Sequence, residues 1–436
     1  MLPKKTLSLR NNFKGNNMII KFTVGNFLSF NERRTLDFEA QGISELKQNV
    51  ISSHNLLRSI VVYGANSSGK SNLIKALHLM RDLVLNSVKL NDSDELEFTP
   101  FLLSAENKNT PTFFEVIFIK ENKKFRYGFE YSQTKIVNEW LFTGKSSKTE
   151  KALFIRTQEG IGVSAQFEEG QGKEEATNDN RLFISLVAQL GGVISKQIME
   201  CFRNYAVLSG VTHKDYSRFS LNMLRKKLAG SKESLSLFQT LKLGFKDVQI
   251  IESEFTPTDL PKSIPKNMKD KLAKEMPGAT IIALKTIHNK YDKNGKITDT
   301  VLLDSVENES EGTKKIMDLS GPIFDTLLLG NVLIIDELDS KLHPLITIQI
   351  VNLFNDPQTN PNNAQLLFAT HDTNLLNADL FRRDQVWFTE KDDREQTDLY
   401  SLYDFNLPDG SKVRNDANLE KNYIRGRYGA IPFITN

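Results

Sequence analysis

The glycine-rich stretch Gly64–Ser71 constrains the fold of this chain more than any other feature. It completes the pattern G-x-x-x-x-G-K-[ST], with Gly64, Gly69, Lys70 and Ser71 at the required positions. The glycines allow a tight turn that directs backbone N–H groups at phosphate oxygens. Lys70 adds positive charge near the β- and γ-phosphates, and the Ser71 hydroxyl can ligate Mg²⁺. The pattern predicts a phosphate loop that binds ATP with Mg²⁺. Its four intervening residues are Ala65, Asn66, Ser67 and Ser68.

The residues on either side of the loop support this interpretation. A short β-branched run, Ile60 to Val62, comes before it. Apolar residues recur at helical spacing after it, at Leu73, Ile74, Leu77, Met80, Leu83, Val84 and Val88. The helix would point its positive N-terminal end at the bound phosphates. A glycine-rich turn between two core elements is the alternative, but the strand–loop–helix order favours a phosphate loop.

A second segment, Asn331–Glu337, predicts a buried strand that ends in two acids. At that position Asp336 can hold the Mg²⁺ shell through water, and Glu337 is placed to polarise the attacking water. A strand that simply ends at a polar turn is the alternative. The phosphate loop in the same chain favours the catalytic interpretation, so we expect an ATPase.

Composition excludes several classes of protein. The chain has 436 residues, enough for two or three domains, and its 56 basic against 54 acidic residues give a net charge of +2. A net charge so close to zero does not by itself favour binding to nucleic acid or membranes. The single cysteine, Cys201, excludes an internal disulfide, fits a reducing cytoplasm and is interpreted as a small buried helix residue. There is no bilayer-spanning apolar run and no secretory signal, so we expect a cytoplasmic protein without membrane contact.

The sequence divides into four expected parts. Residues 1–17 are polar and predict a flexible N-terminal extension, and residues 18–180 predict half of a nucleotide-binding head with an antiparallel β-subdomain. Residues 181–305 predict an inserted, mainly helical lobe that includes strands near 281–287 and 300–303. Residues 306–436 predict the second half of the head. Within these parts, residues 165–180 are expected to form an exposed loop, and no sustained heptads predict a coiled coil.

The two halves of the predicted site lie far apart in the sequence. Lys70 and Asp336 are separated by 336 − 70 = 266 residues, so the chain must leave the nucleotide domain and return. This arrangement resembles the split heads of ABC-type and structural-maintenance-of-chromosomes (SMC) ATPases. Three further segments resemble motifs of these families. Ser310–Thr313 resembles a reduced signature sequence, 338–344 resembles the D-loop with Asp339, and 369–372 resembles the segment with the switch histidine, His371.

The resemblance implies an α/β fold, an ABC-type phosphate-loop ATPase head with an antiparallel β-subdomain and an inserted helical lobe. It implies that Ser310 and Gly312 contact the γ-phosphate bound by the opposite protomer, and that His371 senses this phosphate. Composite sites of this kind require a homodimer or a higher oligomer. Ser310 could instead be an ordinary helix N-cap. The Q-loop glutamine of the family is not assigned to a residue.

The resemblance extends beyond the head motifs. Segments 26–30, 309–313 and 423–432 are similar to AAA-family, ABC-like ATPases of bacterial anti-phage and abortive-infection loci, a group that includes RloA and the AriA subunit of PARIS. It implies an ATP-hydrolysing sensor or scaffold that controls a separate effector, a nuclease, after a DNA or phage-protein trigger. Only 436 − 371 = 65 residues follow His371, without a Toprim-like acidic cluster, so a nuclease would be another chain.

Two other functions stay open at this point. A RecF- or SMC-like DNA-maintenance ATPase would bind DNA directly, although the near-neutral charge and the missing coiled coil disfavour it. The most basic local cluster, Arg414, Lys421, Arg425 and Arg427, could equally be structural. A nucleotide-dependent scaffold with little turnover is the third possibility, and the intact Glu337 argues against it.

Overall fold

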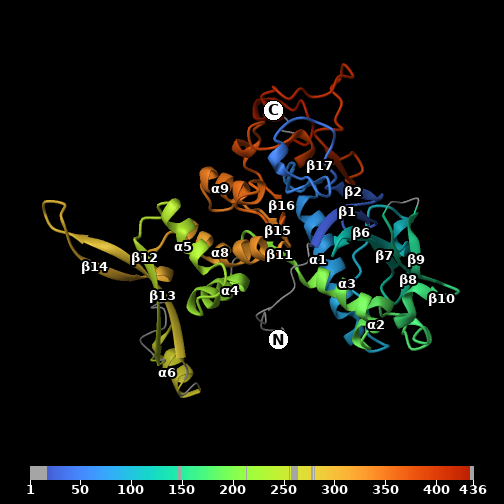
Figure 1. The fold of residues 1–436 in the computed structure, drawn as a ribbon, viewed down its shortest axis with the longest axis horizontal. Helices are drawn as coiled ribbons and strands as arrows, with labels where there is room; N and C mark the ends of the chain where they lie inside the picture. Colours follow the sequence, from blue (N-terminus) through green and yellow to red (C-terminus); the bar gives the residue numbers. More distant parts are fainter. Residues whose placement is uncertain are drawn as a thin grey trace. The chain divides into compact units, whose positions relative to one another are not determined.

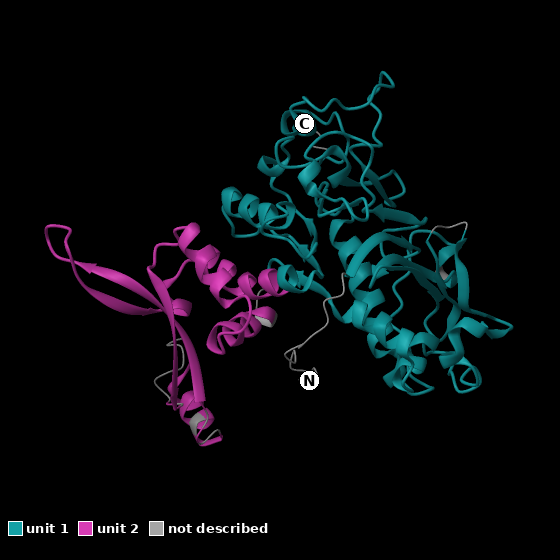
Figure 2. Cartoon of the chain, viewed as in Figure 1, with its two compact units in different colours: residues 1–212, 326–436 teal, residues 213–325 magenta. Residues whose placement is uncertain are grey.

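The structure is a computed structural model that describes residues 17–145, 149–212, 214–254, 256, 264–275, 278 and 280–432. The chain forms two compact units (Figures 1 and 2). Unit 1 comprises residues 1–212 and 326–436, and unit 2 comprises residues 213–325. Of the expected N-terminal extension, residues 1–16 lie outside the described residues. Asn17, its last residue, begins the first strand.

A mainly parallel sheet forms the centre of unit 1. Its strands are β5 (Ser59–Tyr63), β11 (Tyr205–Ser209), β15 (Val332–Asp336), β16 (Gln365–Ala369), β17 (Val386–Lys391) and β18 (Thr397–Ser401). The order is β11-β15-β16-β5-β17-β18, and every neighbouring pair is parallel except β17 and β18. All residues of β5 and β16 are buried, as expected for parallel strands covered on both faces. The predicted strands at the phosphate loop and at Asp336 are confirmed.

Helices cover this sheet. Those beside the sheet are α1 (Lys70–Asn86), α3 (Val193–Arg203), α9 (Pro344–Asn355) and α10 (Leu419–Ile424), while α2 (Phe183–Gln189) packs against α1 and α3. The helix after the phosphate loop is confirmed: α1 buries its predicted apolar residues from Leu73 to Val84 and packs against β15 and α3, and it ends at Asn86, before Val88. Cys201 is fully buried in α3, as predicted. Pro344 occupies the first turn of α9, where its fixed φ suits a helix start.

A seven-stranded antiparallel sheet forms the β-subdomain of unit 1. It contains β1 (Asn17–Gly25), β2 (Arg34–Asp37), β6 (Thr112–Lys120), β7 (Lys123–Tyr131), β8 (Ile136–Thr143), β9 (Lys151–Thr157) and β10 (Gly160–Val163). Glu121 and Asn122 join β6 to β7 with positive φ angles of 51° and 61°, which is the backbone of a two-residue hairpin turn. The predicted antiparallel β-subdomain is therefore confirmed.

The segment 165–180 differs from the exposed loop that the sequence predicts. Phe167 is fully buried against Phe154 and Phe183. The carboxylate of Glu169 accepts the backbone N–H groups of Val193, Ile194 and Ser195 at 2.7–2.9 Å, so it caps the N-terminus of α3. The polar composition of the segment did not indicate that the side chains of Phe167 and Glu169 anchor it.

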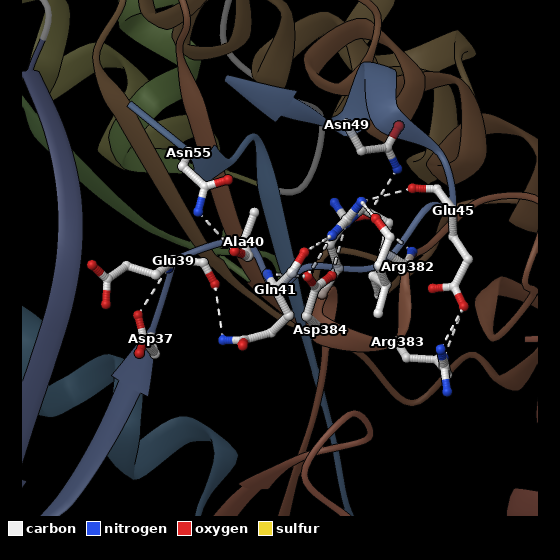
Figure 3. Close-up of polar contacts among 12 residues, drawn as sticks. Asp37, Glu39, Ala40, Gln41, Glu45, Asn49, Asn55, Arg382, Arg383 and Asp384 are labelled. Carbon is white, nitrogen blue, oxygen red and sulfur yellow. Dashed lines mark hydrogen bonds and ion pairs between the residues drawn. The ribbon is translucent and has the colours of Figure 1, made fainter. Parts of the chain in front are cut away.

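A buried ion pair fixes the segment that contains β3 (Val50–Ile51) and β4 (Leu56–Leu57) (Figure 3). Arg382, with a side chain 1% exposed, donates to both carboxylate oxygens of Asp384 at 2.9 and 2.7 Å. Its guanidinium also donates to the carbonyls of Gln41 and Glu45. A buried guanidinium is tolerated because its donors are used.

Unit 2 combines helices with a three-stranded antiparallel sheet. Its elements are α4 (Lys214–Arg225), α5 (Ser231–Thr240), β12 (Asp247–Glu254), α6 (Lys266–Glu275), β13 (Thr280–Tyr291), β14 (Ile297–Asp304), α7 (Ser305–Asn308) and the start of α8 (Glu311–Leu329). The sheet order is β12-β13-β14. The predicted strands at 281–287 and 300–303 are present but longer.

The boundaries of unit 2 differ from those of the expected lobe at 181–305. The buried apolar faces of α2 and α3 pack against α1, so both helices belong to unit 1. The predicted fold class is confirmed: the protein is a mixed α/β structure with an antiparallel β-subdomain. In the part of the chain that the structure describes, no helix is long and apolar enough to cross a membrane.

Candidate nucleotide site

The carboxyl ends of three parallel strands bring the predicted motifs to one edge of the sheet. β16 pairs with both β5 and β15, and Ala369 lies beside Val62. Beyond the strands, the Thr370 N–H donates to the Val62 carbonyl and the Leu338 N–H donates to the Ala369 carbonyl, each at 3.2 Å. Open parallel sheets bind ligands at this edge. The phosphate loop, the Asp336–Glu337 pair and His371 therefore meet here.

The phosphate loop has the compact backbone that its glycines predict. Gly69 has a φ of 117°, and a Cβ atom there would lie 2.3 Å from Oγ1 of Thr397. Residues with a Cβ atom rarely adopt so positive a φ angle, and Thr397 leaves no room for that atom. Position 69 therefore requires glycine. Directly after it, the Lys70 ammonium donates to the carbonyls of Gly64 at 2.7 Å and Ala65 at 3.0 Å. The Lys70 side chain thus bonds to the backbone of its own phosphate loop.

Electrostatics connect Lys70 to the other two motifs. Burial lowers the pKa of Lys70 to about 8, and the carboxylates of Asp336, Glu337 and Asp339 partly oppose this shift. Burial also lowers the pKa of His371, and the Lys70 charge lowers it further, while the same three carboxylates oppose both effects. One cation, one imidazole and three carboxylates therefore share a partly desolvated cluster, the arrangement expected of a functional site.

The turn that carries Glu337 is unusual. Glu337 has a φ of 54°, a left-handed conformation that is uncommon for a residue with a side chain. Gly210, directly after β11, donates its N–H to the Asp336 carbonyl at 2.6 Å. A Cβ atom on Gly210 would lie 1.9 Å from the Glu337 carbonyl oxygen. Gly210 therefore allows the close approach that holds this turn.

The carboxylates at this edge fit a divalent cation. Oδ1 of Asp336 and Oδ1 of Asp339 are buried and have no hydrogen-bond partner among the described residues. A buried carboxylate oxygen without a donor is costly unless a cation or water satisfies it. Ser71, the second residue of α1, provides the hydroxyl that the motif predicts. Mg²⁺ is usually held by one or two protein oxygens together with water and phosphate oxygens, and an oxygen of Asp336 or Asp339 has the chemistry of such a ligand.

Sequence reasoning missed the residues that support the phosphate loop from β17 and β18. Thr389 shares a hydrogen bond of 2.7 Å with the Ser68 hydroxyl. Thr397 donates to the Ser68 carbonyl at 2.9 Å, and its hydroxyl also bonds that of Ser29 at 2.7 Å. The apolar run Val386–Phe388 was the available signal for β17. Because the sequence does not show which strand pairs with β17, this signal could not indicate that Thr389 supports the phosphate loop.

The C-terminal segment contributes apolar support beside the same loop. The Tyr423 ring lies 5.7 Å from that of Tyr63, the last residue of β5, and 5.4 Å from that of Phe388. The Tyr423 hydroxyl donates to the Ala430 carbonyl at 3.0 Å. Part of the segment 423–432, which carried the anti-phage resemblance, thus packs against the strand that leads into the phosphate loop.

The signature-like residues Ser310 and Gly312 belong to unit 2, whereas the other predicted site residues belong to unit 1. The Ser310 hydroxyl accepts the Thr313 N–H at 3.1 Å, so Ser310 is the N-cap of α8. Just before it, Oε1 of Glu309 shares a hydrogen bond of 3.1 Å with Nε2 of His288 in β13. The cap does not exclude a second role, because the N-terminus of α8 carries the partial positive charge that attracts anions.

The sequence comparison identifies the family. Residues 59–377 match the family described as "AAA domain, putative AbiEii toxin, Type IV TA system". The match includes the phosphate loop, the signature-like segment, the Asp336–Glu337 pair and His371, and it covers more than half of the chain. The chain belongs to this AAA-domain family. No curated protein matches the AAA-domain protein in sequence.

Several solved structures are similar to the AAA-domain protein. An SMC head bound to the C-winged helix domain of ScpA is 13% identical, with a TM-score of 0.45, and the match covers 88% of this chain and 97% of that one. The SMC head from Thermotoga maritima is 11% identical, with a TM-score of 0.39 and coverage of 88% and 98%. The recombination mediator RecF is 13% identical, with a TM-score of 0.36 and the same coverage.

Proposed function

We propose that the AAA-domain protein binds and hydrolyses ATP at the carboxyl edge of the parallel sheet. One observation carries this proposal: Lys70, the carboxylates around Asp336 and His371 form one electrostatic cluster at the phosphate loop. The buried Oδ1 atoms of Asp336 and Asp339, which have no hydrogen-bond partner among the described residues, would bind a cation. Each group has a role in transferring a phosphoryl group to water.

The residues of the loop bind and orient the triphosphate. Backbone N–H groups from Gly64 to Ser71 and the first turn of α1 face the phosphates, and Lys70 neutralises the β- and γ-phosphates. Mg²⁺ held by Ser71 and Asp336 would neutralise further phosphate charge. Binding requires the Lys70 ammonium to turn from the Gly64 and Ala65 carbonyls toward the nucleotide.

Glu337 is the proposed base, because its carboxylate follows the cation ligand and can accept a proton from the attacking water. Gly210 holds the backbone of this residue in place. The lowered pKa of His371 keeps its imidazole neutral at physiological pH, so one ring nitrogen can donate to the γ-phosphate while the other accepts. The Asp339 carboxylate accepts the backbone N–H of His371 at 3.4 Å, which fixes the chain at this residue.

We infer that a second copy of the chain completes the site. Ser310 and Gly312 stand at the N-terminus of α8 in unit 2, whereas the cluster consists of residues of unit 1. Two copies related by a two-fold axis would each offer this helix N-terminus to the partner's γ-phosphate, and the same patches would meet reciprocally. The protein would therefore act as a homodimer or as an oligomer built from such dimers.

In the cell, we propose a sensor or scaffold subunit of a bacterial anti-phage defence system that controls a separate nuclease effector. The family description, with its toxin and toxin–antitoxin terms, and the motif resemblance support this role. A phage protein or DNA would be the trigger. A RecF- or SMC-like protein that binds DNA directly is the competing function.

Glu337→Gln tests the chemical proposal. The variant should bind ATP with unchanged affinity but hydrolyse it about 10²–10⁴-fold more slowly, because an amide cannot accept the proton of water. Phosphate release and equilibrium nucleotide binding are the two measurements. The matched control is Glu159→Gln, at an exposed residue of the β9–β10 turn, which should leave both unchanged. Wild-type turnover in Glu337→Gln would exclude Glu337 as the base.

Phage challenge tests the biological proposal. Bacteria that carry the gene with its genomic neighbours should resist phage, and Lys70→Ala or deletion of the neighbouring effector gene should each abolish resistance. The competing function predicts salt-dependent DNA binding by the isolated protein. Such binding, together with unchanged phage sensitivity, would replace the defence role with DNA maintenance.

A further inference from the structure

The C-terminal helix α10 contacts two elements at the proposed catalytic edge. The ring of Tyr423 lies 5.7 Å from that of Tyr63, the residue directly before the phosphate loop. The carboxylate of Glu420, in the first turn of α10, accepts the Thr373 hydroxyl at 3.1 Å. Thr373 lies two residues after His371. One helix therefore contacts both the strand that leads into the phosphate loop and the turn that carries the histidine.

A second bond connects this turn directly to the strand before the phosphate loop. The Tyr63 hydroxyl donates to the carbonyl of Asp372, the residue after His371, at 3.1 Å. Tyr63 is 1% exposed, so water hardly competes for this bond. Burial raises the pKa of Tyr63 far above its ordinary value, and the charges of Asp372 and Asp339 raise it further. The hydroxyl therefore stays protonated and remains a donor at physiological pH.

Helix α10 is itself held by the chain that follows it. The Tyr423 hydroxyl donates to the Ala430 carbonyl at 3.0 Å, which closes the segment after the helix. The carbonyl of Tyr428 accepts the hydroxyl of Tyr400, a residue of β18, at 2.8 Å. Tyr423 is 7% exposed and Tyr428 is fully buried. The helix therefore provides a fixed point from which Glu420 can hold the turn.

His371 depends on such support for its position. Its side chain is exposed, so packing around the ring contributes little to where it lies. The Asp339 carboxylate accepts its backbone N–H, and the bonds at Asp372 and Thr373 hold the next two residues. A catalytic group that is misplaced by about 1 Å can lose about 10²-fold in rate. A loss of support at this turn should therefore appear in the chemical step.

We propose that Tyr63 and Glu420 are positioning residues for His371. They hold the turn after β16 so that the imidazole reaches the γ-phosphate, and they act on phosphoryl transfer rather than on nucleotide binding. Neither residue belongs to the phosphate loop, so the affinity for ATP should not depend on their polar groups. The proposal rests on the proposed ATP site and on the role of His371 within it.

The first test separates binding from turnover. Glu420→Ala removes the acceptor of the Thr373 hydroxyl and should lower kcat for MgATP by about tenfold, while the equilibrium affinity for MgATP stays within about twofold. Tyr63→Phe keeps the ring and should give the same pattern. Glu420→Gln retains an acceptor oxygen, so its kcat should lie within about twofold of the wild-type value. Ile424→Ala, at a residue 59% exposed in the same helix, is the matched control and should change neither quantity.

The second test asks whether the effect passes through His371. In single-turnover assays, adding Glu420→Ala to His371→Ala should slow hydrolysis by less than about twofold further, because two residues that act through one group are not additive. Thr373→Val removes the donor of the same bond and should lower kcat as Glu420→Ala does, with no further loss in the double variant. A further tenfold loss in the His371→Ala background would overturn the proposal, because Glu420 would then act independently of the histidine.

Amide hydrogen exchange of the nucleotide-free protein provides a measurement that does not need activity. Glu420→Ala and Tyr63→Phe should each speed exchange across residues 371–376, while exchange in β16 and α10 stays unchanged. Unchanged exchange at this turn, or wild-type kcat in both variants, would overturn the positioning role while the ATP site remains. Wild-type protein that does not hydrolyse ATP would remove the proposed function, and the positioning role with it.

Discussion

The two sheets that carry the predicted motifs differ sharply in burial. In unit 1, every residue of β5 and β16 is buried, and β15 is buried up to Asp336. In unit 2, the residues of β14 are exposed from Ile297 to Leu302, and β12 is mostly exposed. The first sheet ends in the proposed catalytic groups, and the second leads through α7 to Ser310.

This contrast suggests a division of labour. Groups that stabilise charge must be held in place before the reaction, and a sheet covered on both faces provides that. A segment with few buried apolar contacts has a lower local stability and can respond to a partner. We therefore expect unit 1 to hold the phosphate chemistry rigidly, and unit 2 to adjust the signature-like segment.

The largest expected effect is at the phosphate loop. Lys70→Ala should reduce ATP turnover by at least about 10²-fold, because the phosphates lose a charge-assisted donor. Lys75→Ala is the matched control, since Lys75 is an exposed lysine of the same helix. Steady-state ATPase assays compare the two. If both variants kept wild-type turnover, the rigid edge of unit 1 would not be the site.

Glu139 tests how far the rigidity of unit 1 extends from the site. This fully buried carboxylate accepts the Tyr127 hydroxyl at 3.0 Å and the N–H groups of Phe183 and Ile184 at 2.7 and 3.1 Å, which joins β8 to the start of α2. Glu139→Ala should lower the free energy of unfolding by about 3–5 kcal/mol, because three buried donors lose their acceptor. Denaturant unfolding measures this loss. A loss below about 1 kcal/mol would mean that α2 is not fixed through Glu139.

Glu139 also predicts a pH dependence. Burial raises its pKa in the folded protein above the ordinary value of 4.5. Between 4.5 and the folded-state pKa, the folded protein binds more protons than the unfolded chain, so this contribution to stability falls as pH rises. Glu139→Gln removes the titrating group and should flatten that part of the stability–pH curve. An unchanged stability–pH curve in Glu139→Gln would contradict the raised pKa of Glu139.

Truncating one apolar residue in each sheet tests the contrast directly. Ile334→Ala in β15 should cost about 2–5 kcal/mol, because the side chain is fully buried and its loss leaves a cavity. Leu302→Ala in β14, where the leucine is 44% exposed, should change stability by no more than about 0.5 kcal/mol. Denaturant unfolding with probes in each unit measures both. Similar losses at the two positions would show that the sheets do not differ in packing.

The smallest expected effect is local to unit 2. His288 holds Glu309, whose side chain is 8% exposed, next to Ser310. His288→Ala should cost about 1–2 kcal/mol locally and speed amide hydrogen exchange across α7 and the start of α8, because a mostly buried carboxylate loses its partner. Exchange in β5 and β15 should not change, and His288→Gln should partly restore protection. Faster exchange in β5 would show that the two units are not independent.

Much of unit 1 was predictable because its signals are local. The phosphate loop, the strand before it and the helix after it lie within Ser59–Asn86, where spacing alone specifies each element. The hairpin at Glu121–Asn122 was predictable for the same reason. The acidic pair after β15 needed only an apolar run and two acids.

The other parts of the fold and of the site depend on contacts between residues that are distant in the sequence. β11 has only five residues and pairs with β15, which follows more than a hundred residues later. Its pairing is what brings Gly210 to the Glu337 carbonyl, and no local pattern encodes that contact. The bond from Thr397 to Ser68 spans 329 residues. Such support residues become visible only when the strand order is known.

We propose that ATP hydrolysis combines the unit 1 cluster of one copy with the Ser310 segment of another. Mixing Lys70→Ala with Ser310→Arg protein tests it most directly, because a mixed dimer contains one site with both halves intact. Each variant alone should be inactive. ATPase activity should reappear on mixing and be greatest near equal amounts of the two variants. A mixture that stays inactive at every ratio, although mixed dimers form and both variants are folded, would contradict it.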